Sequence, residues 1–130
     1  MPECLIIAED CLDLLTTLVR ALTAEYRIVP VCRAGDIFAE LDKNRDTRAI
    51  LLDLGFTDGM DGFDALALLR RDYPEIPVLA MSASWDEALV CETVTRLGAA
   101  RYYRKPVILT ELRKDLRSLF GSLQGKPNET

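Results

Sequence analysis

An apolar run, residues 49–52, ends directly at the carboxylate of Asp53. A short continuous apolar run of this kind is typical of a strand that is buried on both faces of a parallel sheet, and it places Asp53 at the carboxyl end of that strand. Burying a carboxylate beside such a run costs free energy unless the carboxylate has a partner. The sequence therefore predicts that cations or further acids lie near Asp53.

Three other strand-like segments also end in polar side chains. Residues 4–8 end in Glu9 and Asp10, residues 77–81 end in Ser82, and residues 101–104 end in Lys105. Residues 26–31 are one more short apolar run with the composition of a strand. The chain is thus expected to contain five strands, four of which present a polar or charged group at the carboxyl end.

Apolar residues at helical spacing occupy the segments between these strands. The expected helices cover residues 12–25, a short stretch around 37–41, residues 63–72, residues 84–96 and a final helix along 109–119. Asp61 is expected to cap the third helix, and the capping-box pattern of Ser84 and Glu87 is expected to open the fourth. Alternating strands and helices predict an α/β protein with a parallel sheet covered on both faces. We expect one domain, residues 1–124, followed by a tail or the start of a linker at 125–130.

In a sheet of this kind the functional groups gather beyond the carboxyl ends of the strands. The carboxylates of Glu9, Asp10 and Asp53 would meet there, and because they repel one another they favour a hard divalent cation, Mg²⁺ or Mn²⁺. With the cation bound, Asp53 could act as a nucleophile toward a phosphoryl group. Lys105 and Ser82 fit the roles of neutralising and hydrogen-bonding the phosphoryl oxygens.

The composition further limits which functions and cellular locations are expected. A net charge of −5 argues against a nucleic-acid-binding surface, and because the chain has no histidine, any phosphohistidine must come from a partner. The four cysteines form no CxxC pair, which favours free, buried thiols in a reducing compartment. The sequence shows neither a signal peptide nor an apolar stretch of membrane-spanning length, so we expect a cytoplasmic protein that does not contact a membrane.

Together these motifs resemble the receiver domains of two-component response regulators, and the resemblance covers nearly the whole chain. The matching features are, in chain order, the pair Glu9-Asp10, Asp53, the triplet Met60-Asp61-Gly62, Ser82-Ala83, Gly98-Ala99, Tyr102 and Lys105-Pro106. Each motif alone is weak, but their order and their positions at strand ends make the match specific. The resemblance implies the flavodoxin-like (βα)5 fold, a doubly wound sheet with strand order 2-1-3-4-5.

By position, the resemblance implies that Asp53 is the phosphoacceptor and takes its phosphoryl group from the phosphohistidine of a histidine kinase or phosphotransfer protein. Asp10, Asp53 and the backbone carbonyl of Gly55 would bind Mg²⁺, and Glu9 would act mainly through water. A domain of this kind is no enzyme beyond its self-catalysed phosphoryl transfer and a slow autodephosphorylation. The slow rate is expected because Gly55 and Ser84 offer no amide or carboxylate to orient a water.

The resemblance also implies a switch. Ser82 and Lys105 would contact the phosphoryl group, and Tyr102 would move inward in concert with Ser82. This movement would reshape the surface of the fourth helix, fifth strand and fifth helix, which a downstream protein or a fused effector domain would read. Phosphorylation-dependent dimerisation is left open. Tyr102 and Tyr103 alternate across a strand, so one is expected to pack inward and the other to face out.

Two departures from the family pattern concern the loop after Asp53. The spacing from Asp53 to Gly62 is one residue longer than is usual in the family, and the usual proline is absent near Thr57 and Asp58. The alternative reading is therefore a pseudo-receiver, a protein-binding module that works without phosphorylation. A third reading, a metal-dependent phosphohydrolase of the haloacid dehalogenase type, ranks lower because such enzymes carry a second aspartate where this chain has Gly55, and a cap domain for which there is no room.

Overall fold

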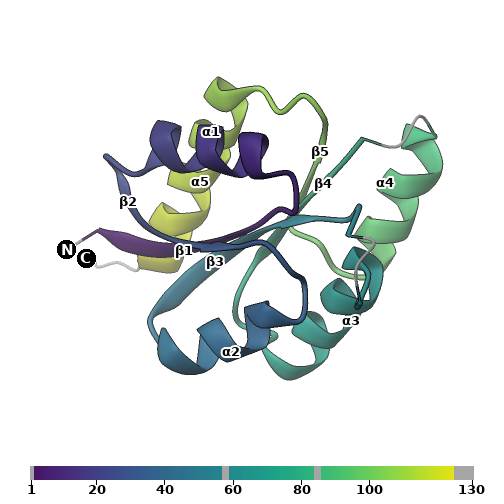
Figure 1. Ribbon diagram of the computed structural model, residues 1–130, viewed down its shortest axis with the longest axis horizontal. Helices are drawn as coiled ribbons and strands as arrows, with labels where there is room; N and C mark the ends of the chain where they lie inside the picture. Colours follow the sequence, from purple (N-terminus) through teal and green to yellow (C-terminus); the bar gives the residue numbers. More distant parts are fainter. Residues whose placement is uncertain (1, 57–58, 84–85, 125–130) are drawn as a thin grey trace.

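The computed structural model of the protein describes residues 2–56, 59–83 and 86–124. Strands and helices alternate strictly along the chain (Figure 1), in the order β1 (Glu3–Ala8), α1 (Leu12–Leu22), β2 (Tyr26–Val31), α2 (Asp36–Lys43), β3 (Thr47–Asp53), α3 (Gly62–Asp72), β4 (Val78–Ser82), α4 (Glu87–Arg96), β5 (Arg101–Arg104) and α5 (Leu109–Gln124). The tail expected at 125–130 lies outside the described residues. The elements otherwise follow the alternation that the sequence predicts.

The strands form one parallel sheet of order β2-β1-β3-β4-β5, which confirms the predicted flavodoxin-like topology. The register aligns the carboxyl ends of neighbouring strands: Ala8 pairs with Leu52, Asp53 pairs with Met81, and Ser82 pairs with Arg104. Every strand therefore delivers its last side chains to the same edge of the sheet. This common edge is where the sequence places the polar groups.

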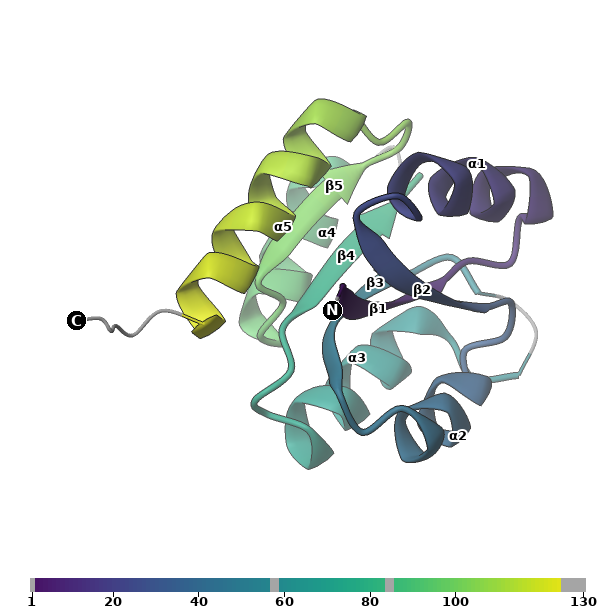
Figure 2. The ribbon, with the colours of Figure 1, turned by 90° about the vertical axis from the view of Figure 1, so that its left-hand side faces the viewer.

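Side chains of alternating strand positions enter two separate apolar clusters. In β3, Ile50 and Leu52 belong to the cluster under α2, α3 and α4, whereas Ala49 and Leu51 belong to the cluster under α1 and α5. Figures 1 and 2 show these two sets of helices on opposite sides of the sheet. Both faces of the central strands are thus covered, which explains why their sequences are continuously apolar instead of alternating.

The same covering of both faces corrects the expectation for the two tyrosines of β5. They do alternate across the strand, but neither faces away from the protein. Tyr103 is buried in the cluster under α1 and α5, and Tyr102 is half-buried against the cluster under α2, α3 and α4. Because helices lie on both sides of the sheet, each of the two side chains packs against a helical layer and neither points into solvent.

Other local expectations were also wrong. Helix α4 begins at Glu87 with Asp86 as its N-cap, whose Oδ1 accepts a hydrogen bond from the Leu89 amide at 3.3 Å. The capping box that the sequence suggested would have begun at Ser84, which lies outside the described residues. All four cysteines are free, as expected, but only Cys4 is buried; Cys11, Cys32 and Cys91 are exposed.

Candidate functional site

The acidic residues are positioned by hydrogen bonds that continue the sheet one residue beyond each strand. The amide of Glu9 donates to the Val31 carbonyl at 2.9 Å, and the amide of Leu54, directly after Asp53, donates to the Met81 carbonyl at 2.8 Å. Both acids therefore lie on the regular backbone of the sheet. Strand pairing thus anchors the backbone at both positions.

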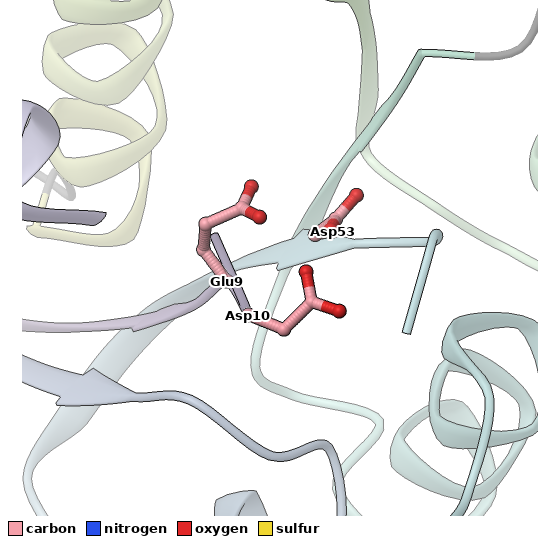
Figure 3. Close-up of side chains that lie close together, drawn as sticks. All are labelled: Glu9, Asp10 and Asp53. Atoms are coloured by element: carbon pink, nitrogen blue, oxygen red, sulfur yellow. The ribbon is translucent and has the colours of Figure 1, made fainter. Parts of the chain in front are cut away.

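Glu9, Asp10 and Asp53 meet at this edge, as the sequence predicts. Each offers one carboxylate oxygen that lies within 4.8 Å of the others, and Figure 3 shows the three side chains gathered beyond the ends of β1 and β3. Glu9 is completely buried and Asp53 is 2% exposed, whereas Asp10 faces solvent. The cluster thus has a buried floor and one open side.

Lys105 reaches the same cluster from the end of β5. Its Nζ lies 2.7 Å from Glu9 Oε1 and 3.1 Å from Asp53 Oδ1. The contact with Glu9 is a close ion pair. Burial alone would lower the pKa of Lys105, but the two carboxylates outweigh it and the pKa is raised. Lys105 is therefore held as a cation between two acids.

One lysine does not balance three carboxylates. Burial raises the pKa of Glu9 to about 7, even though Lys105 and the Cys11 amide, which donates to Glu9 Oε2 at 3.0 Å, both act to lower it. Negative charge is thus in excess at this edge. An all-oxygen donor set with excess negative charge and an open side fits a hard cation such as Mg²⁺.

The side chain of Asp53 is oriented by its own loop. Its Oδ1 accepts a hydrogen bond from the amide of Gly55 at 3.1 Å, and Leu54 and Phe56 are both buried in the cluster under α2, α3 and α4.

Ser82 and Tyr102, the expected switch residues, lie on the neighbouring strands. Ser82 is the buried last residue of β4, and its carbonyl accepts a hydrogen bond from the Lys105 amide at 2.8 Å. The Tyr102 hydroxyl is buried without a well-directed hydrogen bond in the described part of the chain. Burial raises the pKa of Tyr102, and the nearby Ser82 hydroxyl acts in the opposite direction. The two side chains are thus close enough to influence each other.

Sequence reasoning missed two contributors to the site. The Cys11 amide, which holds Glu9, is a backbone group that any residue would supply, so no side-chain pattern could reveal it. Gly62 was recognised as part of a motif, but its very close approach to the backbone of Asp53 and Leu54 was not. Only the three-dimensional path of the loop brings these positions together.

The protein thus has a doubly wound parallel sheet with acids and a lysine at the carboxyl ends of its strands. This arrangement places it in the class of α/β proteins whose ligands bind at that edge of the sheet. The chain belongs to the response regulator receiver domain family of two-component systems, because the family model matches residues 5–117.

Curated relatives agree with this assignment. The transcriptional regulatory protein TcrA of Mycobacterium tuberculosis is 33% identical over 117 residues, which cover 88% of this chain and 45% of TcrA. The two-component response regulator ARR2 of Arabidopsis thaliana is 31% identical over 112 residues, which cover 86% of this chain and 15% of ARR2. The chain thus spans less than half the length of these relatives.

Solved structures share the fold at low sequence identity. A CheY-like response regulator receiver domain protein from Methanospirillum hungatei superposes with a TM-score of 0.82 at 21% identity, covering 97% of this chain and all of that one. The CheX-CheY-BeF3-Mg+2 complex from Borrelia burgdorferi gives a TM-score of 0.82 at 20% identity, covering 92% and 90% of the two chains. Within the described ranges, we find no helix with the length and apolarity needed to cross a membrane.

Proposed function

We propose that this receiver domain is a phosphorylatable switch in which Asp53 accepts a phosphoryl group from the phosphohistidine of a histidine kinase or phosphotransfer protein. The observation that carries the proposal is the convergence of three carboxylates and Lys105 at one edge of the sheet. Carboxylates form aspartyl phosphates when the charge on the phosphoryl oxygens is neutralised. Lys105 and a cation in the acidic cluster would provide that neutralisation.

The transfer needs no other acid or base from the protein. A carboxylate oxygen of Asp53 attacks phosphorus, the bond between phosphorus and the imidazole nitrogen breaks, and its electron pair remains on the nitrogen, which takes up a proton from solvent water. Glu9, Asp10, Asp53 and the carbonyl of Gly55 would hold Mg²⁺, or Mn²⁺ in its place. When bound, the cation neutralises developing charge on the phosphoryl oxygens. The structure of a CheY from Borrelia burgdorferi with BeF3 and Mg+2, which shares this fold, supports the choice of ion.

Lys105, Ser82 and Tyr102 would carry the signal away from Asp53. Lys105 now contacts Asp53, so an arriving phosphoryl group would compete with the carboxylate for its ammonium group. Ser82 would turn toward the phosphoryl oxygens, and Tyr102 would fill the space left beside it. The surface of α4, β5 and α5 would then present a new shape to a downstream protein or to a fused effector domain, or to a second copy of the domain.

The wider setting is proposed on the same basis. The receiver unit would comprise residues 1–124, followed by a tail or linker, and would act in the cytoplasm without touching a membrane or nucleic acid itself. Its chemistry would be limited to its own phosphorylation and slow autodephosphorylation. The relatives TcrA and ARR2, which are much longer and are described as a transcriptional regulatory protein and a response regulator, support a fused effector as the output.

Intact-protein mass spectrometry after incubation with acetyl phosphate tests the proposal. We expect the mass of one phosphate to be added only when Mg²⁺ is present, and not in Asp53→Asn. Asp36→Asn is the matched control, because Asp36 is an exposed aspartate at the start of α2 and should leave the gain unchanged. If the native protein gains no phosphate, the pseudo-receiver reading replaces this one.

A further inference from the structure

Helix α3 begins in direct contact with the end of β3. Its first residue, Gly62, is buried, and a Cβ atom built on it would lie 2.3 Å from Leu54 Cα, 2.7 Å from the Asp53 carbonyl oxygen and 2.8 Å from the Leu54 carbonyl carbon. Separations this short do not occur between a Cβ and other heavy atoms. All three atoms belong to the backbone, so no side chain can turn away to make room.

This closeness distinguishes Gly62 from the other described glycines. Gly35 and Gly121 have nothing within 4 Å of the added Cβ, and at Gly98 the nearest atoms belong to the flexible side chain of Arg70. At Gly55 the nearest atom is Asp53 Oδ1 at 3.4 Å, which is ordinary contact. Gly62 is therefore required by its contact with the backbone and not by a left-handed conformation.

The peptide against which Gly62 packs is the one that carries Asp53. On one side, the Leu54 amide is fixed to β4 by its hydrogen bond to Met81. On the other side lies the first turn of α3, which is held in place because Asp61 Oδ1 accepts a hydrogen bond from the Asp64 amide at 2.8 Å. Gly55, one residue further along, donates to the Asp53 carboxylate. A shift of this peptide would move both the carboxylate and its hydrogen-bond donor.

We propose that Gly62 is a positioning residue for Asp53: by letting the start of α3 rest on the Asp53-Leu54 peptide, it fixes the direction of the carboxylate and of the Gly55 backbone beside it. For phosphoryl transfer this inference rests on the proposed function. The chain leaves the sheet after Leu54 and returns to the same point at Gly62.

Gly62→Ala tests the proposal through two readouts that a loss of stability alone would not change. We expect its rate of phosphorylation by acetyl phosphate, per folded molecule, to fall by roughly tenfold to a hundredfold, because small displacements of a nucleophile cost this much. We also expect the amide resonance of Gly55 to shift in the nuclear magnetic resonance spectrum. The folded fraction is measured by circular dichroism on the same samples.

Two matched variants separate positioning from stability. Leu69→Ala removes a buried side chain from the last turn of the same helix, so it destabilises α3 without touching Asp53. Gly121→Ala adds the same methyl group to a helix where it meets nothing. Per folded molecule, both should be phosphorylated within about twofold of the native rate, since distant sites act independently. Their Gly55 resonance should not shift.

If Gly62→Ala does not fold, the cap of α3 provides the test. Asp61→Ala removes the hydrogen bond that holds the first turn, and Asp61→Asn keeps an equivalent acceptor while removing the charge. We expect Asp61→Ala to slow phosphorylation and shift the Gly55 resonance, and Asp61→Asn to restore both. An unchanged rate, or an unshifted Gly55 resonance, in Gly62→Ala or Asp61→Ala would overturn the proposal.

The outcome also distinguishes this inference from the proposed function. If the native protein takes up no phosphate, the proposed function fails, and the Gly55 resonance alone then decides whether Gly62 positions Asp53. If the native protein is phosphorylated and Gly62→Ala behaves like Gly121→Ala, the proposed function stands and the positioning role is wrong.

Discussion

The hydroxyl of Tyr103 donates a hydrogen bond of 2.6 Å to Asp115 Oδ2, and this bond joins β5 to α5. Arg101 Nε lies 3.7 Å from the other oxygen of the same carboxylate. Tyr103 is buried, whereas the Asp115 side chain is 26% exposed. The bond thus spans the boundary between the apolar cluster and the surface, and it gives this face of β5 a polar connection in addition to packing.

This bond predicts a stability that decreases in alkali. Burial, and then the hydrogen bond to Asp115, raise the pKa of Tyr103 above its ordinary value of 10.0. As the pH rises through 10, the unfolded chain loses this phenolic proton while the folded protein keeps it, so the free energy of unfolding falls. One such group contributes a decrease of up to about 1.4 kcal/mol per pH unit.

Urea unfolding at a series of pH values would measure this effect. We expect Tyr103→Phe to lose about 1–2 kcal/mol at neutral pH, because Asp115 is left without its donor, and to show a weaker decrease in alkali. Tyr73→Phe, at the end of α3, is the control and should follow the native curve. An identical alkaline slope in Tyr103→Phe and the native protein would contradict the assignment.

Removing the ammonium group of Lys105 from between the two buried acids should destabilise the protein when no metal ion is bound. Lys105→Met leaves Glu9 and Asp53 without their common partner, and loss of one member of a buried ion pair costs about 3–5 kcal/mol. Chemical denaturation without divalent ions would measure this. Lys43→Met is the matched control, since Lys43 is exposed and its ion pair with Glu40 spans 3.9 Å, so its effect should stay within about 0.5 kcal/mol.

Magnesium should partly replace the missing charge in Lys105→Met. Because a divalent cation reduces the repulsion among the same carboxylates, we expect the difference in unfolding free energy between Lys105→Met and the native protein to be smaller with Mg²⁺ than with a chelator. A difference that is the same in both conditions would show that the ion does not bind at the acidic cluster.

Magnesium should also stabilise the native protein itself. A ligand that binds only the folded state adds about 2.7 kcal/mol when its concentration is a hundred times its dissociation constant, and the melting temperature rises accordingly. Differential scanning calorimetry with Mg²⁺ and then with excess chelator would show the rise and its reversal. Asp10→Asn should weaken the rise, because Asp10 is the exposed acid of the cluster, whereas Asp13→Asn in the first turn of α1 should not.

Much of this fold and site could be predicted because the relevant information is local in the sequence. An apolar run followed by an acid specifies both a buried parallel strand and the edge to which the acid belongs, and this pattern placed Glu9 and Asp53 correctly. Lys105 was also placed correctly, because it follows the last strand. Asp61 was identified as a cap from its position before a helix, and its bond to the Asp64 amide confirms this.

What could not be predicted depends on the path of the backbone between elements. The start of α4 was misplaced because the sequence pattern favours Ser84 as the cap, whereas the side chain of Asp86 caps the helix. The burial of Tyr103 depends on the covering of that face of the sheet by α1 and α5, and α1 is remote from β5 in sequence. Position 62 requires glycine because the chain comes back there against the backbone of Asp53 and Leu54. No pattern of residues in the sequence indicates this contact.

The two tyrosines of β5 are connected differently to the helices on the two sides of the sheet. Tyr103 is bonded to α5, and α5 is further connected to α1 through Arg113, whose guanidinium donates to the Ala21 carbonyl at 2.7 Å. Tyr102 points the other way, and α4 buries only two of its side chains, Val90 and Val94. If Tyr102 moves inward as proposed, α4 would shift relative to α5, and a partner that contacts both helices would detect that shift.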